Sequence, residues 1–274
     1  MERNSASVER QRAVSEDQYD SQVERWSFHD TEDPLTRFLR DRRIKIGLKR
    51  AMKLSGGTPE NWDVLVVCGG VGGEGTLLAN LGFHSVTVSD FSENALKICQ
   101  LRDPRLKTSV VNAEAMAIPD RSFDLVLVQD GLHHLPRPML GYTEMLRVAR
   151  RAVIVIEPHA GLVANLVGTT WENHSGEINY VFRWNQLMLE EPARSLLLDS
   201  PTDVKAIRIW DHNLVVGKLV RKLRLGSGRA AVLAARFLYA ALNIPFSWLG
   251  NMMVGVVVKT DTDVNTLPVE RPTR

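Results

Sequence analysis

The chain has little of several features that mark particular protein classes. Its 274 residues include only two cysteines, Cys68 and Cys99, and neither has the Cys-x-x-Cys or Cys/His spacing of a metal site. This excludes a disulfide scaffold and predicts a reduced, cytoplasmic protein without a structural metal. The formal net charge is only +2, which is too small for the dense basic face of a nucleic-acid-binding domain. A small molecule is therefore the expected partner, while the oligomeric state is left open.

Long hydrophobic runs are also absent. The N-terminus is polar and lacks the apolar segment of a signal peptide. The apolar run 230–242 is too short to span a bilayer and is interrupted by Arg236. This run belongs to a basic amphipathic stretch, 217–242. Its basic residues are expected to form the solvent-exposed face of a helix. Attachment to an anionic membrane surface, or a lipid-like acceptor, is the alternative.

What the chain does have is a regular alternation of strand and helix patterns. This alternation predicts a parallel sheet with helices on both faces. The expected strands are 64–67, 85–89, 108–111, 123–128 and 152–157, the expected helices between them are 75–81, 93–101 and 139–149, and two further strands are expected at 204–210 and 252–258.

The segments around this core predict the domain organisation. Residues 1–18 are expected to be a flexible extension and 19–55 an amphipathic helical lid over a cofactor. The main domain is expected over 60–260, with an inserted cap at about 160–200 and a helical segment at about 215–245. Residues 261–274 are expected to be a flexible tail.

A glycine-rich turn is the strongest motif. The apolar run from Val64 enters five glycines between residues 69 and 75, and glycine lets a backbone turn sharply and approach a ligand closely. Asp90 lies twenty residues beyond Gly70, at the end of the next apolar run, where an acid accepts the ribose hydroxyls of an adenosine-containing cofactor. Residues 70–75 also match G-x-G-x-x-G, so an NAD(P)-dependent oxidoreductase is an alternative.

Two later segments narrow the choice: Val111-Asn-Ala-Glu114 leading to Ser122-Phe-Asp124, and Gln129-Asp-Gly-Leu-His-His134. Together with the glycine turn they resemble the class I S-adenosylmethionine-dependent methyltransferases that act on small molecules, over about residues 60–160. The resemblance implies a Rossmann-like doubly wound sheet, mostly parallel with an antiparallel final strand. It also implies S-adenosylmethionine as cofactor and methyl transfer to a small-molecule nucleophile, for which an aromatic or lipid-like natural product is a candidate.

The resemblance also implies which residues contact the cofactor. Those expected are Gly70, Val71 and Gly72 at the methionyl end, Asp90 and Phe91 near the ribose, Asn112, Ala113 and Glu114 near the adenine, and Gln129 and Asp130 in the loop facing the sulfonium. The chain departs from the family pattern where an acid is replaced by Val66, a glycine by Cys68 and a second acid by Asn112. A non-catalytic cofactor-binding protein is therefore a further alternative.

Histidines and aromatic residues are the candidates on the acceptor side. His133, His134 and His159 are candidate general bases, because neutral imidazole takes a proton near pH 7; packing is the alternative role. A pocket wall is expected from mixed aromatic and charged side chains, with ordinary packing again the alternative. The expected acceptor contacts are His134, Trp171, Tyr180, Arg183 and Trp184.

Overall fold

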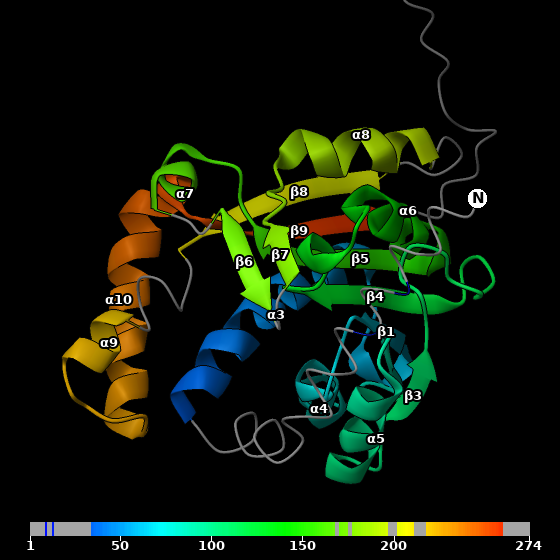
Figure 1. Ribbon diagram of the computed structural model, residues 1–274, viewed down its shortest axis with the longest axis horizontal. Helices are drawn as coiled ribbons and strands as arrows, with labels where there is room; N and C mark the ends of the chain where they lie inside the picture. The colour runs from blue at the N-terminus through cyan, green and yellow to red at the C-terminus, as the bar shows by residue number, and fades with distance from the viewer. Residues whose placement is uncertain are drawn as a thin grey trace, which may run out of the picture.

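The computed structural model describes residues 9, 13, 34–167, 170–174, 177–196, 202–210 and 218–259. Seven strands form one sheet in the order β3-β2-β1-β4-β5-β9-β8 (Figure 1). Neighbours from β3 to β5 run parallel, whereas β9 is antiparallel to both β5 and β8. This confirms the predicted Rossmann-like sheet. The strands are β1 Asp63–Val67, β2 Ser85–Asp90, β3 Lys107–Val110, β4 Phe123–Gln129, β5 Ala149–Pro158, β8 Thr202–Ile209 and β9 Met252–Lys259.

Both faces of the sheet are buried. In β1, Val64 and Val66 belong to one hydrophobic cluster and Leu65 and Val67 to another, because successive side chains of a strand point to opposite faces. The helices that cover the first face are α3 (Pro34–Ser55), α4 (Gly73–Asn80) and α5 (Glu93–Arg102), and those that cover the second are α6 (Pro138–Val148) and α8 (Gln186–Leu196). The sheet is therefore doubly wound, as the alternating pattern predicts.

Local signals set where these helices begin. The Ser92 hydroxyl accepts a hydrogen bond from the Ala95 backbone N–H at 3.2 Å and so caps α5. Pro138 is the first residue of α6, where its missing N–H is not needed. α4 follows Gly72, whose φ of 85° is a left-handed conformation that glycine adopts without strain.

The residues predicted as a lid contribute a core helix. Ile44, Leu48 and Ala51 of α3 are buried in the cluster that includes strands β1, β5 and β9. A Cβ at Gly47 would lie 2.8 Å from Ile154, so α3 packs directly on the sheet at that point. The rest of the predicted lid, 19–33, lies outside the described residues, as do the predicted tail and nearly all of the predicted N-terminal extension.

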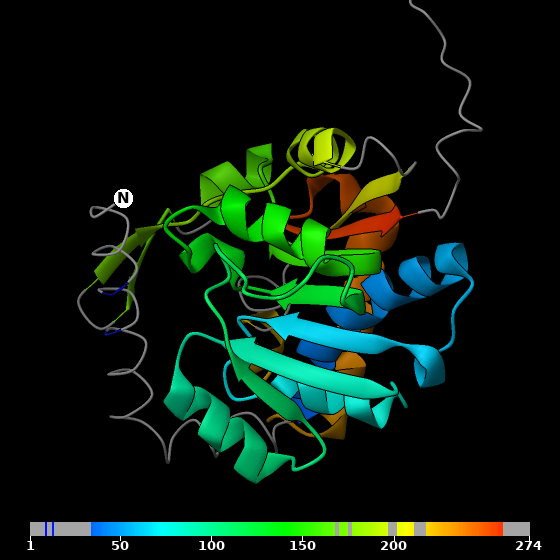
Figure 2. The same cartoon turned by 90° about the vertical axis from the view of Figure 1, so that its right-hand side faces the viewer.

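The segment predicted as an inserted cap contains α7 (Leu162–Val167), the hairpin β6 (Trp171–His174) and β7 (Glu177–Tyr180), and α8. Figure 2 shows that the hairpin extends away from the seven-stranded sheet. Helix α8, in contrast, packs on that sheet. The remaining elements are α9 (Lys218–Lys222), α10 (Arg229–Phe246) and the 3-10 turns η1 (Pro59–Asn61), η2 (Leu132–His134) and η4 (Ser247–Leu249).

Lys259, at the end of β9, gives the fold a testable pH dependence. Its buried ammonium donates to the carbonyls of Leu146 and Ala149, each at 2.5 Å, and burial lowers the pKa of Lys259 from 10.5 to about 8. Between these pH values the unfolded chain binds more protons, so the free energy of unfolding gains a contribution that rises with pH. We expect Lys259→Met to remove that rise in denaturant titrations at several pH values, whereas Lys97→Met, at an exposed site, leaves it. Parallel pH curves for Lys259→Met and the unsubstituted chain would contradict the assignment.

Candidate active site

The turn after β1 is built from strained and close-packed positions. Cys68, Gly70 and Gly72 have φ of 53°, 48° and 85°, and the Gly72 N–H donates to the Gly69 carbonyl at 2.9 Å. A Cβ at Gly69 or Gly75 would lie 2.6 Å from Val88 of β2. Gly69 and Gly75 are therefore required by their contact with β2. The turn brings the backbone of Gly70, Val71 and Gly72 to the edge where the parallel strands end, here called the carboxyl edge.

Asp90 ends β2 beside this turn. Its carboxylate accepts the backbone N–H groups of Gly70 and Ser92, each at 2.9 Å. Burial raises the pKa of Asp90 above its ordinary value, opposed by the N–H groups of Ser92, Gly70 and Phe91. The predicted partners Gly70 and Asp90 are thus brought into direct contact, and the half-buried Phe91 follows them. A carboxylate with two oxygens accepts further hydrogen bonds, which fits a ribose diol.

Gln129 ends β4 at the same edge and is nearly buried. Its amide nitrogen donates to Glu74 of α4 at 3.0 Å, whereas its buried Oε1 has no hydrogen-bond partner. A buried amide oxygen without a partner is costly, because the group has lost its hydration. An ammonium donor of a bound ligand would satisfy it. The residues at this edge therefore fit a cofactor with a ribose and an amino group.

The predicted adenine segment forms a compact turn. Asn112 Oδ1 accepts the Glu114 N–H at 3.0 Å, which fixes the turn around the buried Ala113. The Glu114 carboxylate is bound by Arg137, through its backbone N–H at 2.5 Å and its guanidinium at 2.6 and 2.9 Å. Glu114 therefore fixes the start of α6, and its carboxylate is already used. Of the three residues predicted near the adenine, Asn112 and Ala113 remain the candidates.

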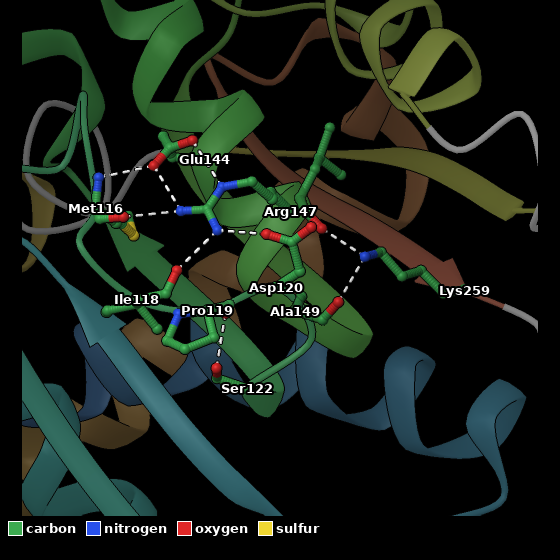
Figure 3. Close-up of polar contacts among 10 residues, drawn as sticks. Met116, Ile118, Pro119, Asp120, Ser122, Glu144, Arg147, Ala149 and Lys259 are labelled. Carbon is green, nitrogen blue, oxygen red and sulfur yellow. Dashed lines mark hydrogen bonds and ion pairs between the residues drawn. The ribbon is translucent and has the colours of Figure 1, made fainter.

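The chain after this turn is fixed to α6 by Arg147 (Figure 3). Its guanidinium donates to the carbonyls of Met116 and Ile118 at 2.8 and 2.7 Å and pairs with Asp120 and Glu144. Glu144 in turn accepts the Met116 N–H at 2.7 Å. The network positions the far end of the segment that begins with Asn112. Asp124, by contrast, begins β4 at the opposite end of the sheet and pairs with Arg150 and Arg151.

A buried glutamate organises the loop after β4. Glu157 has no exposed surface and accepts the backbone N–H groups of Gly131 at 2.9 Å and Leu132 at 2.7 Å. Its second oxygen lies 2.5 Å from His133 Nδ1. In the tautomer whose Nδ1 donates to Glu157, Nε2 is the basic nitrogen of the ring. The geometry is that of an imidazole oriented by a carboxylate.

The other two histidines differ in setting. His134 is half-buried, with its ring centroid 4.1 Å from that of His133. His159 is buried, its Nδ1 lies 2.8 Å from the Trp184 carbonyl, and burial lowers its pKa. Both follow strands that end at the carboxyl edge. Their roles as general bases stay predictions.

Asp130, which is predicted to contact the cofactor, forms an ion pair with a residue of α3. Arg43, which is almost fully buried, donates to both carboxylate oxygens of Asp130 at 3.2 and 2.8 Å. The φ of Asp130 is 52°, a left-handed conformation that is unusual outside glycine. The pair ties the core helix to the loop that carries His133 and His134.

The predicted acceptor residues do not form one group. Trp184 is fully buried and packs edge-on against Tyr142 and Phe182 at 5.4 and 5.2 Å, so it has a core contact and its role at the acceptor stays a prediction. Trp171 and Tyr180 lie on the hairpin, are more than half exposed and pack against each other at 5.3 Å. Arg183 is half-buried and donates to the Val181 carbonyl at 3.4 Å.

Sequence reasoning missed three residues that organise this edge: Glu74, Glu157 and Arg43. Of these, Glu157 carried a readable signal, because it is a single acid at the end of an apolar strand and a buried carboxylate requires donors. Arg43 pairs with a residue 87 positions away, and nothing local indicates that contact.

Comparisons with known proteins agree with this geometry. Residues 65–156 match the family model described as a methyltransferase domain. Demethylmenaquinone methyltransferase of Staphylococcus aureus is 31% identical over 130 residues, which are 45% of this chain and 53% of that protein. The enzyme of the same name from Renibacterium salmoninarum is 34% identical over 87 residues, 32% of this chain and 36% of that protein. The chain thus spans about half or less of the length of these curated relatives.

Solved structures share the fold at low identity. A chain of the complex between the Haloferax volcanii Trm112 methyltransferase activator and a methyltransferase superposes with a TM-score of 0.53 at 14% identity, covering 90% of this chain and 98% of that one. The [4+2]-cyclase SpnF superposes with a TM-score of 0.50 at 17% identity, covering 80% of each chain. These likenesses concern the fold alone.

Proposed function

We propose that this chain is a class I S-adenosylmethionine-dependent methyltransferase that transfers a methyl group to a small apolar acceptor, and the match of residues 65–156 to a methyltransferase domain supports this. The observation that carries the proposal is the meeting of Gly70, Asp90 and Gln129 at the carboxyl edge. Open α/β sheets bind their ligands at this edge. The free thiols Cys68 and Cys99 favour the cytoplasm as its compartment.

Each part of the cofactor has a candidate partner. Asp90 would accept the ribose hydroxyls, Gln129 Oε1 the ammonium of the methionyl group, and the turn at Asn112 and Ala113 the adenine. The bound cofactor supplies an electrophilic methyl group on a sulfonium. The protein then has to bring a nucleophile in line and exclude water.

His133 is the residue that we propose to move a proton. Glu157 orients the ring through Nδ1, and Nε2 takes the proton from the hydroxyl of the acceptor as the methyl group is transferred. His133 lies in the loop after Gln129, so it is positioned by the same strand that carries the proposed ammonium partner. His134 and the hairpin pair Trp171 and Tyr180 are proposed to contact the acceptor.

The acceptor class is proposed as aromatic and lipid-soluble. The two curated relatives carry the name demethylmenaquinone methyltransferase, and an aromatic acceptor suits stacking on exposed aromatic side chains. An NAD(P)-dependent oxidoreductase is disfavoured, because the dinucleotide-binding fold usually has six parallel strands in the order 3-2-1-4-5-6. Here the antiparallel β9 lies between β5 and β8.

The test is transfer of label from methyl-labelled S-adenosylmethionine. The full chain is incubated with reduced and oxidised aromatic quinones and with a bacterial lipid extract, and label is counted in the organic phase. We expect label from the reduced, hydroxyl-bearing aromatics, and none with Asp90→Ala. Cofactor binding without transfer to any of these acceptors would favour a binding protein, and binding of NADH in place of the methyl donor would favour the oxidoreductase; either result overturns the proposal.

A further inference from the structure

The face of α10 that points away from α3 is apolar and exposed. Ala231, Ala235 and Tyr239 bury one side of α10 against Leu35 and Leu39 of α3. On the opposite side Leu233, Phe237 and Ile244 are 69%, 73% and 82% exposed. These three lie on one helix face, because residues four and eleven positions apart align. Figure 1 shows α10 and α9 at one end of the molecule, away from α4 and α5.

The segment of the chain that carries this face has charged residues of one sign. Residues 212–260 contain no aspartate or glutamate, and six basic residues lie between 218 and 236. Leu219, Leu223 and Leu225, in and after α9, are also exposed, so the basic and apolar side chains are interleaved. Such a surface complements one that is anionic outside and apolar beneath.

A groove of about 620 Å³ between α3 and α10 adds an anion-binding element. Its lining includes Arg37, Arg229 and Arg236 together with the apolar side chains of Phe38 and Leu233. The one acid of the lining, Asp41, is already paired with Arg40 at 3.0 Å. None of the three arginines forms an ion pair with another described residue. Guanidinium groups are the usual partners of phosphate.

We propose that α9, α10 and the groove beside α3 dock on an anionic lipid bilayer. Leu233, Phe237 and Ile244 enter the interface between headgroups and acyl chains, and the groove arginines bind lipid phosphates. Trp248, 62% exposed just beyond α10, lies at the same end and suits the interfacial zone.

The helix lies in the plane of the surface instead of crossing it. By length and composition alone, Arg229–Leu249, which is longer than the apolar run 230–242, could span a bilayer. Contact with α3 is what holds it: Tyr239 is buried there, and the Arg42 guanidinium lies 3.8 Å from its ring centroid. Insertion of α10 would carry this charged partner into the acyl core or strip it away.

Docking in this way brings the carboxyl edge near the membrane. Trp210, which follows β8, donates its backbone N–H to Asn243 and its indole N–H to the Phe246 carbonyl, at 3.1 and 3.0 Å. β8 and β5 are both antiparallel to β9, so β8 ends at the same edge as β1, β4 and β5. The C-terminal end of α10 is therefore attached to the edge that holds the candidate active site.

Sedimentation with lipid vesicles tests the docking without cofactor or acceptor, so its result is independent of the proposed function. The full chain is mixed with vesicles of phosphatidylcholine alone or of phosphatidylcholine with phosphatidylglycerol. We expect binding to the anionic vesicles that weakens with salt. Arg229→Ala with Arg236→Ala weakens it roughly thirtyfold, and Leu233→Glu with Phe237→Glu abolishes it. Leu101→Glu, at a leucine 84% exposed on α5, leaves it unchanged.

Circular dichroism confirms that each variant is folded before its binding is compared. Absence of binding to anionic vesicles by the unsubstituted chain overturns the proposal. So does equal binding by the arginine variants, because the groove would then have no part in it. A dimer in analytical ultracentrifugation that Phe237→Glu separates, without vesicle binding, would identify the face as a contact between two copies of the chain and would also overturn the proposal.

Discussion

Asp90→Ala is expected to weaken the binding of S-adenosylhomocysteine about a hundredfold, because two hydroxyl-to-carboxylate hydrogen bonds are lost at roughly 1.5 kcal/mol each. The change also leaves the Gly70 and Ser92 N–H groups without their acceptor, which loosens the glycine turn. Isothermal titration calorimetry measures the effect directly. The demethylated product is the better probe, since it cannot react.

Glu93→Ala is the matched control for Asp90→Ala. Glu93 lies three residues further along, at the first turn of α5, and its exposed carboxylate pairs only with Lys97 among the described residues. Its removal should leave the dissociation constant within about twofold. Equal weakening by both substitutions would mean that charge near α5, and not the Asp90 contact, governs binding.

Glu157→Gln is expected to lower the free energy of unfolding by about 3 kcal/mol, because a fully buried carboxylate that accepts from three donors is replaced by an amide with only one acceptor oxygen. The same change releases His133, so kcat should fall about a hundredfold while the KM for the cofactor changes little. Denaturant titration and steady-state kinetics measure the two effects separately.

Two further variants separate these roles. His133→Gln should reproduce the loss of kcat with a smaller loss of stability, since Glu157 keeps both backbone donors. Glu190→Gln, at a partly exposed pair with Arg194 on α8, should leave the denaturant midpoint unchanged, because exposed ion pairs contribute little. Unchanged kcat in Glu157→Gln would remove His133 as the proposed base, whatever the effect on stability.

The sheet could be predicted because its signals are local. Continuous runs such as Val64–Val67 indicate strands buried on both faces, and the glycines after them indicate the turn. The contact between Gly70 and Asp90 follows from that topology, since adjacent parallel strands end at one edge. The fold, and the contact between Gly70 and Asp90 at the carboxyl edge, could therefore be predicted from periodicity and motif spacing.

The contacts that depend on distant packing were not accessible. The sequence predicts that Trp184 contacts the acceptor. In the structure its ring is buried and packs against Tyr142 and Phe182. Arg43 lies in a segment that the sequence predicts as an amphipathic lid over the cofactor, and only the packing of α3 on the sheet brings it to Asp130. Glu114 matches the adenine motif, whereas its carboxylate is bound by Arg137 from the start of α6.

The central claim, that Asp90 and Gln129 jointly hold an adenosyl ligand at the carboxyl edge, is tested most directly by a crystal structure of the chain with S-adenosylhomocysteine. The account predicts both ribose hydroxyls on the Asp90 carboxylate and the ligand ammonium on Gln129 Oε1, the buried oxygen that has no partner without it. A ligand bound elsewhere, or an edge closed by side chains while Asp90 keeps only its backbone donors, would contradict it.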